Sequence, residues 1–199
     1  MKERGKFIVI YGANNIGKST QVELLNERLK EEGIFSRRLK YPIYDLEPTG
    51  PRINAALREG LNLTDEKLQE EFAQNRQDFE PQLLQMLASG LYIVAEDYKG
   101  TGIAWGMTRG VSLERMEEMN LGLLPEDLCI LLDGERYTSG VERKHRHEVD
   151  SDWERARSVH LGLAVRYGWE IVSANSSREK VQEKVWNVVQ IRLLKSLNI

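Results

Sequence analysis

A short segment near the amino terminus combines the residue types that hold phosphate. Four residues of GANNIGKST match the spacing G-x-x-x-x-G-K-[ST], namely Gly12, Gly17, Lys18 and Ser19. Glycines let the backbone curl so that amide hydrogens face phosphate oxygens, while the lysine neutralises charge and the hydroxyl can ligate Mg²⁺. We therefore predict that the segment binds ATP with Mg²⁺ and that Lys18 is catalytic. The predicted contacts with ATP are Gly12, Asn15, Ile16, Gly17, Lys18, Ser19 and Thr20.

Phe72 and Arg76 lie four residues apart in a segment with a helical pattern. On one helix they project from the same face, so a ring could stack on a base and a guanidinium could hydrogen-bond the edge of that base. Taken alone, the pair has a competing interpretation, because Phe72 could belong to the core and Arg76 to the solvated surface.

A polar, basic stretch occupies residues 139–152. We predict a mobile lid at about 136–152, in which Arg143 and Arg146 close over the triphosphate and stabilise charge on the transferring phosphoryl group as catalytic residues. The competing interpretation is a solvated face, which is the usual meaning of a run of charges.

Two adjacent acids, Glu96 and Asp97, directly follow the apolar run LYIVA. The carboxyl ends of parallel strands form the ligand-binding edge of an α/β sheet, where a carboxylate could accept a proton from a sugar hydroxyl. Solvent-facing acids are also common in turns at strand ends. Which of these two interpretations of Glu96 and Asp97 holds depends on which other residues lie at this edge of the sheet.

The elements that position these residues follow an α/β pattern. Apolar runs at 7–11, 91–95, 128–132 and 169–172, with a weaker run at 37–41, predict strands that are buried on both faces of a parallel sheet. Between them we expect a helix that ends before Gly33, a second that begins at Thr64 and continues to Gly90, and a last one that begins at a capping box, Ser176 to Glu179.

Composition sets the outer limits. The 199 residues carry a formal net charge of −3, are 41% hydrophobic and contain one cysteine, Cys129. We expect one domain over 1–199, located in the cytoplasm without disulfides or a membrane segment. This net charge rules out a globally basic nucleic-acid binder, whereas small-molecule nucleotide substrates remain compatible with it.

Five segments together resemble the thymidylate kinase family. They are FIVIYGANNIGKSTQVELLNERL, the YP pair at 41–42, FAQNR at 72–76, EDYKGTGIAW at 96–105 and LPEDLCILLD at 124–133. The resemblance implies a three-layer P-loop kinase fold with a five-stranded parallel sheet flanked by helices. It also implies ATP-dependent phosphorylation of dTMP to dTDP and a homodimer.

The resemblance assigns further site residues. It implies that Glu96 is catalytic and, with Ser19, helps to hold Mg²⁺. The residues that it places at the acceptor nucleotide are Asn14, Tyr41, Phe72, Arg76, Asp97, Tyr98, Thr101 and Trp105.

Two positions depart from the family pattern. Asp97 and Tyr44 stand where the family has arginines that face the acceptor phosphate. Either other cations serve that phosphate, with Lys40, Arg52 and Lys99 as candidates, or there is no acceptor phosphate. Two alternatives to a thymidylate kinase therefore stay open: a deoxynucleoside kinase with Glu96 or Asp97 as general base, and a nucleotide-binding module that has lost transfer.

Overall fold

The computed structural model describes residues 3–137 and 150–194. The predicted catalytic residues Arg143 and Arg146 lie outside the described residues, as does most of the predicted lid. Among the described helices, none combines the length and apolar character that crossing a lipid bilayer would require.

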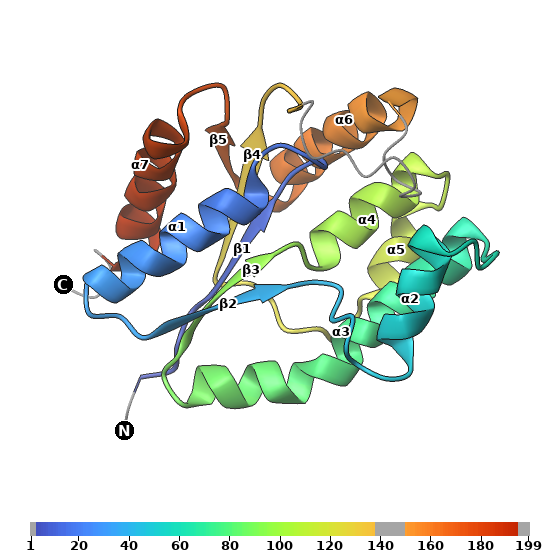
Figure 1. Cartoon of the computed structure of the whole chain (residues 1–199), viewed down its shortest axis with the longest axis horizontal. Coiled ribbons are helices and arrows are strands. Elements are labelled where there is room, and N and C mark those ends of the chain that lie inside the picture. Colours follow the sequence, from blue (N-terminus) through green and yellow to red (C-terminus); the bar gives the residue numbers. More distant parts are fainter. Residues whose placement is uncertain (1–2, 138–149, 195–199) are drawn as a thin grey trace.

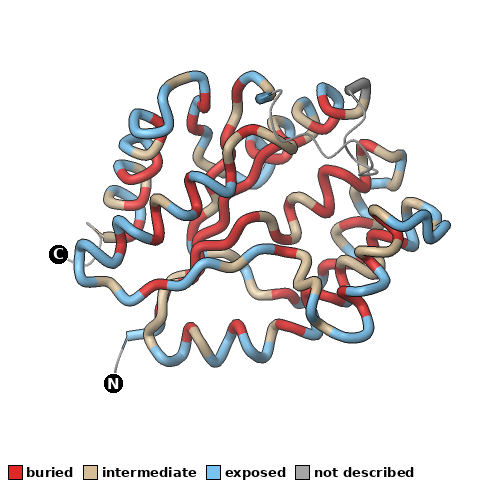
Figure 2. The backbone as a smooth tube through the Cα atoms, in the orientation of Figure 1, coloured by how far each residue is buried: buried red, intermediate tan, exposed pale blue. Residues whose placement is uncertain are grey.

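Five parallel strands form one sheet in the order β2-β3-β1-β4-β5. Their bounds are β1 Phe7–Tyr11, β2 Ser36–Lys40, β3 Tyr92–Glu96, β4 Leu128–Asp133 and β5 Glu170–Ser173. All five predicted strands are thus confirmed, four of them within one residue at each end and the first without any shift. The apolar runs are continuous because strand residues on both faces are covered, as the buried central strands in Figure 2 show.

Helices cover both faces of this sheet (Figure 1). On one face, Ile8 and Ile10 of β1 pack with Leu25 and Leu29 of α1 (Lys18–Glu31) and with Val185 of α7 (Arg178–Val189). The other face turns the alternate residues of β1 toward α3 (Asp65–Ala88) and α6 (Asp150–Tyr167). The result is the predicted arrangement of helices, sheet and helices in three layers.

The remaining helices surround the carboxyl edge of the sheet. They are α2 (Thr49–Arg58), α4 (Lys99–Thr108) and α5 (Leu113–Met119), and a π-helix, Gln190–Leu194, continues α7. The sequence analysis did not anticipate α2, α4 or α5. Glycine and proline have low helix propensity, so the sequences of α2, with a glycine and a proline, and of α4, with three glycines, do not look helical.

The helix ends test the predicted caps. Thr64 begins α3 as expected, since its side chain accepts a hydrogen bond from the Lys67 amide, and Gly33 has the expected left-handed conformation after α1 (φ +77°). The capping box of α7 was placed one residue too early. Ser177, rather than Ser176, caps the helix by accepting from the Lys180 amide, because either of two adjacent serines has the chemistry to do so.

Candidate nucleotide-binding site

The loop between β1 and α1 has the shape that phosphate binding requires. Left-handed backbone conformations occur at Asn15 (φ +59°) and Gly17 (φ +93°), and Gly12 has φ +147°. A Cβ atom on Gly12 would lie 2.7 Å from the carbonyl oxygen of Leu132, so this position admits only glycine. The curled backbone leads directly into the amino end of α1, where amide groups favour anions.

Lys18 lies inside this loop. Its Nζ donates hydrogen bonds to the carbonyl oxygens of Gly12 (2.9 Å) and Ala13 (3.0 Å) and lies 3.7 Å from Oδ1 of Asp97. The side chain is almost fully buried. The positive charge is therefore fixed at the mouth of the phosphate loop, paired with a carboxylate that an incoming phosphate can replace.

The two adjacent acids face two different lysines. Parallel pairing sets Glu96 beside Lys40 of β2, and the Lys40 Nζ lies 3.0 Å from Glu96 Oε1. Asp97 follows with a left-handed backbone (φ +64°), and its carboxylate accepts a hydrogen bond from Thr101 Oγ1 at 2.7 Å. Burial raises the pKa of Asp97, and the neighbouring Lys18 charge partly offsets that rise. The acids are therefore not solvent-facing turn residues, which rules out the bland interpretation of this pair.

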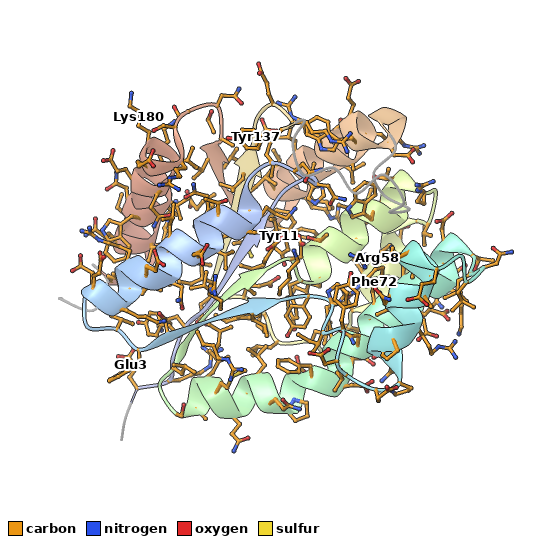
Figure 3. All side chains as sticks on the ribbon, viewed as in Figure 1. Glu3, Tyr11, Arg58, Phe72, Tyr137 and Lys180 are labelled. Carbon is orange, nitrogen blue, oxygen red and sulfur yellow. The ribbon has the colours of Figure 1, made fainter. Side chains whose placement is uncertain are left out.

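A cavity of about 380 Å³ extends from the phosphate loop to the space between α2, α3 and α4. Its wall contains most of the predicted site residues: Asn14, Asn15, Gly17, Lys18, Ser19, Thr20, Tyr41, Phe72, Arg76, Glu96, Asp97, Tyr98, Thr101 and Trp105. Figure 3 labels Arg58 and Phe72 at the α2 and α3 end of the cavity and Tyr137 near the phosphate loop. Gly12 and Ile16 do not line it, because Gly12 lies behind Lys18 and Ile16 packs in the core.

The end of the cavity remote from the phosphate loop is lined mainly by aromatic side chains. Phe72 is half-buried there and packs on Leu57 and Leu68 while leaving part of its ring at the cavity. Tyr41 and Tyr98 form another wall with ring centroids 5.0 Å apart. These rings form an apolar, aromatic surface suited to a planar ring.

Arg76 is held at the edge of that surface. Its Nε donates to Asn120 Oδ1 at 3.1 Å, and burial lowers the pKa of the guanidinium to about 10. Within the described residues, Nη2 finds no hydrogen-bond partner, although the side chain is 3% exposed. A Cβ atom on Gly102 would lie 2.9 Å from Nη2, so the absence of a side chain there makes room for the guanidinium. The interpretation of Arg76 as a solvated surface residue is therefore wrong.

Of the three cations predicted as candidates for an acceptor phosphate, one lines the cavity and two do not. Lys40 lines the cavity. Lys99 instead pairs with Glu126 at 2.9 Å and Arg52 with Glu71 at 2.8 Å, and neither belongs to the cavity wall.

Sequence reasoning missed several residues of the wall. Arg58 of α2 lines the cavity, with Nη1 donating to the Tyr44 hydroxyl at 3.0 Å and the guanidinium 5.1 Å from the centre of the Tyr44 ring. Gln69 of α3 is 1% exposed and also lines the cavity. The only signal for Gln69 was its spacing of three residues from Phe72 and seven from Arg76, which places all three side chains on one helix face.

The residues near the phosphate loop fit a magnesium ion. Ser19 supplies a hydroxyl and Glu96 a carboxylate, and both are hard oxygen donors that line the cavity. No cluster of three or more histidine, cysteine or acidic side chains with metal-binding geometry occurs in the described part of the chain. The donor set is that of an ion bound mainly by phosphate oxygens and water, which is how Mg²⁺ is usually held with nucleotides.

A phosphate loop between β1 and α1, a parallel sheet in the order 2-3-1-4-5 and a cavity that continues to an aromatic pocket together define a P-loop nucleotide kinase. The family model for thymidylate kinase matches residues 10–185. The chain belongs to the thymidylate kinase family.

Individual relatives agree with this assignment. The chain is 30% identical over 221 residues to a thymidylate kinase of Trichodesmium erythraeum, with 96% of this chain and 97% of that protein covered. Similarity to the human thymidylate kinase is 29% over 188 residues, covering 92% and 88% of the two chains. The solved structure of a thymidylate kinase from Candida albicans superposes with a TM-score of 0.85 at 22% identity, covering 94% and 92%, which shows the shared fold.

Proposed function

We propose that the protein transfers the γ-phosphate of ATP to dTMP and releases dTDP and ADP. The observation that carries this proposal is the continuity of one cavity between Lys18 in the phosphate loop and the Phe72 and Arg76 surface. Two nucleotides bound at its two ends would meet with their phosphates facing each other. Membership of the thymidylate kinase family supports dTMP as the acceptor.

Catalysis by this site requires positioning and charge stabilisation rather than a covalent intermediate. The loop amides between Asn14 and Ser19 would hold the phosphates of ATP, and Lys18 would exchange Asp97 for phosphate oxygens. Gly12, Asn15, Ile16, Gly17 and Thr20 shape the same segment. A Mg²⁺ ion held by Ser19 and Glu96 would neutralise phosphate charge.

At the acceptor end, Phe72 would stack on the thymine ring and Arg76 would donate to a carbonyl at its edge. Tyr41, Tyr98, Thr101 and Trp105 line the cavity and would complete the walls around the nucleoside, and Asn14, which also lines it, would face the sugar. We assign the acceptor phosphate to Lys40 and Arg58. These two cations line the cavity from β2 and α2. They would take the place of the family's two arginines, which are absent at Tyr44 and Asp97.

The remaining expectations complete the proposal. The chain would act as one domain over 1–199, with residues of about 136–152 as a lid that brings Arg143 or Arg146 to the transferring phosphoryl group. We place it in the cytoplasm as a homodimer that binds neither nucleic acid nor membrane.

The decisive experiment measures ADP release with Mg·ATP and a panel of acceptors: dTMP, dUMP, dCMP, dGMP, thymidine and deoxycytidine. We expect dTMP to give the highest kcat/KM and Lys18→Ala to abolish its use. Preference for thymidine over dTMP would show a nucleoside kinase instead. Tight nucleotide binding without turnover of any acceptor would show a module that has lost transfer.

A further inference from the structure

Three polar atoms in the wall of the cavity have no hydrogen-bond partner among the described residues. They are Tyr41 Oη, Gln69 Oε1 and Arg76 Nη2, each fully buried and without a hydrogen bond to any described residue. Buried polar groups are almost always paired, so orphaned atoms that share one cavity indicate a ligand that pairs them. Tyr41 and Arg76 were expected at the acceptor. Gln69 was not expected there, and no contact within the described part of the fold explains why a glutamine occupies this position.

Gln69 would serve the fold better as an apolar residue. Its neighbour in sequence, Leu68, packs with Ile53, Ala56 and Leu57 in the cluster between α2 and α3, against which Phe72 also lies. A carboxamide with an unpaired oxygen at 1% exposure weakens such a region relative to a methionine of similar size. The cost is offset only when something in the cavity donates to that oxygen.

The helix sets Gln69 and Arg76 on either side of Phe72. Residues 69 and 76 are seven apart, which returns them to nearly the same face of α3 about 10 Å apart along its axis. Phe72 lies between them on that face. The long side chains of Gln69 and Arg76 start on either side of Phe72, so both can reach the same edge of a pyrimidine stacked on its ring.

The two orphaned atoms have opposite polarity. Arg76 Nη2 can only donate, so it requires a carbonyl oxygen, whereas Gln69 Oε1 can only accept, so it requires an N–H or O–H. A carbonyl adjacent to an N–H is the imide edge of thymine and uracil. Cytosine presents an amino group and an unprotonated ring nitrogen at the corresponding positions, which would oppose donor to donor at Arg76.

We propose that Gln69 is a specificity-determining residue that reads the acceptor base, its Oε1 accepting a hydrogen bond from N3–H while Arg76 donates to the adjacent O4. This inference rests on the proposed use of a pyrimidine acceptor. No proton is transferred in this contact. It selects among pyrimidines by matching one acceptor and one donor in a dry pocket.

The test compares Gln69→Met with Gln74→Met. Gln74 is on the same helix but is exposed and donates to Asp78 at 2.7 Å, so it matches the substitution without touching the cavity. Calorimetry without ATP measures binding of dTMP, dCMP and 3-methyl-dTMP, in which a methyl group replaces the N3 hydrogen. Thermal unfolding of the free protein provides a second readout.

We expect Gln69→Met to weaken dTMP binding about tenfold and to narrow the preference for dTMP over both analogues, while the free protein melts at the same or a higher temperature. Gln74→Met should change none of the affinities. A lower melting temperature with an unchanged preference would make Gln69 a structural residue and overturn the inference.

A further acceptor, 5-hydroxymethyl-dUMP, tests whether Gln69 faces N3–H of the base or its C5 substituent. If the wild type binds it more tightly than dTMP and Gln69→Met removes that advantage, the carboxamide faces C5 and the N3–H contact is wrong. Failure of the proposed function is separate from both results, since it would leave the wild type unable to bind dTMP at all.

Discussion

The two ends of the cavity satisfy their polar groups in opposite ways. At the phosphate end, Lys18 faces Asp97 and Lys40 faces Glu96, so each cation meets an acid of the chain. At the base end, Arg76 Nη2, Gln69 Oε1 and Tyr41 Oη are buried without partners among the described residues.

The difference implies two modes of binding. A base can enter a rigid pocket and supply hydrogen bonds that the protein lacks, so its binding needs little rearrangement. A phosphate must displace a carboxylate from a lysine before it gains a charge-assisted hydrogen bond. Substitutions at the base end should therefore alter selectivity, whereas those at the phosphate end should alter charge balance and rate.

The largest effect is expected at Lys18. Lys18→Met removes the charge that stabilises the transferring phosphoryl group and takes from the half-buried Asp97 the lysine with which it pairs, so we expect kcat to fall about 10³-fold or more. The kcat of each variant is measured as steady-state ADP release with saturating dTMP. Lys180→Met is the matched control, because Lys180 is exposed on α7, far from the cavity (Figure 3). Activity of Lys18→Met within tenfold of wild type would contradict the assigned role.

The second effect concerns the acid that opposes an acceptor phosphate. Two unit charges about 8 Å apart interact by about 2 kcal/mol at an effective dielectric near 20, so Asp97→Asn should tighten dTMP binding by roughly thirtyfold. Thymidine has no phosphate, and its affinity should not change. Calorimetry without ATP separates this effect from catalysis. An equal gain for both ligands would show that Asp97 acts through the shape of the site.

The third prediction concerns the cation that sequence reasoning missed. Arg58→Met should raise the KM for dTMP about tenfold, the value of one hydrogen bond to a charged group, and leave the KM for ATP unchanged. Arg52→Met is the control on the same helix, since Arg52 pairs with Glu71 away from the cavity. Equal responses of the two variants would exclude Arg58 from the acceptor phosphate and leave that role to Lys40.

The parts of the site that were predictable depend on local spacing. The phosphate loop is contiguous, and Phe72 and Arg76 are related by one helical turn, so both follow from the geometry of a single element. The strands were equally clear because a strand buried on both faces is a continuous apolar run.

The parts that were missed depend on packing between elements. Three glycines make 99–108 resemble a loop, yet a Cβ on Gly106 would lie 2.3 Å from Met116 Sδ, which shows that Gly106 lets α4 pack closely on α5. Lys99 was a reasonable candidate by position, but the start of α4 directs it to Glu126. Arg58 and Gln69 have the types of solvated helix residues, and only tertiary structure brings them to the cavity.

The smallest effect should come from Gly102, which touches the base end alone. Gly102→Ala places a methyl group 2.9 Å from Nη2 and 3.2 Å from Nη1 of Arg76, and the bond from Nε to Asn120 limits how far the guanidinium can retreat. We expect the KM for dTMP to rise a few-fold with no change in the KM for ATP.

Gly162→Ala in α6 is the control for that substitution, because among the described residues nothing beyond its own turn of helix lies within 4 Å of the added Cβ. The helix should gain about 0.5–1 kcal/mol in free energy of unfolding. A change in the KM for ATP in Gly102→Ala would mean that the two ends of the cavity are mechanically coupled. The base end would then not be a rigid pocket independent of the phosphate end, and the contrast between the two modes of binding would fail.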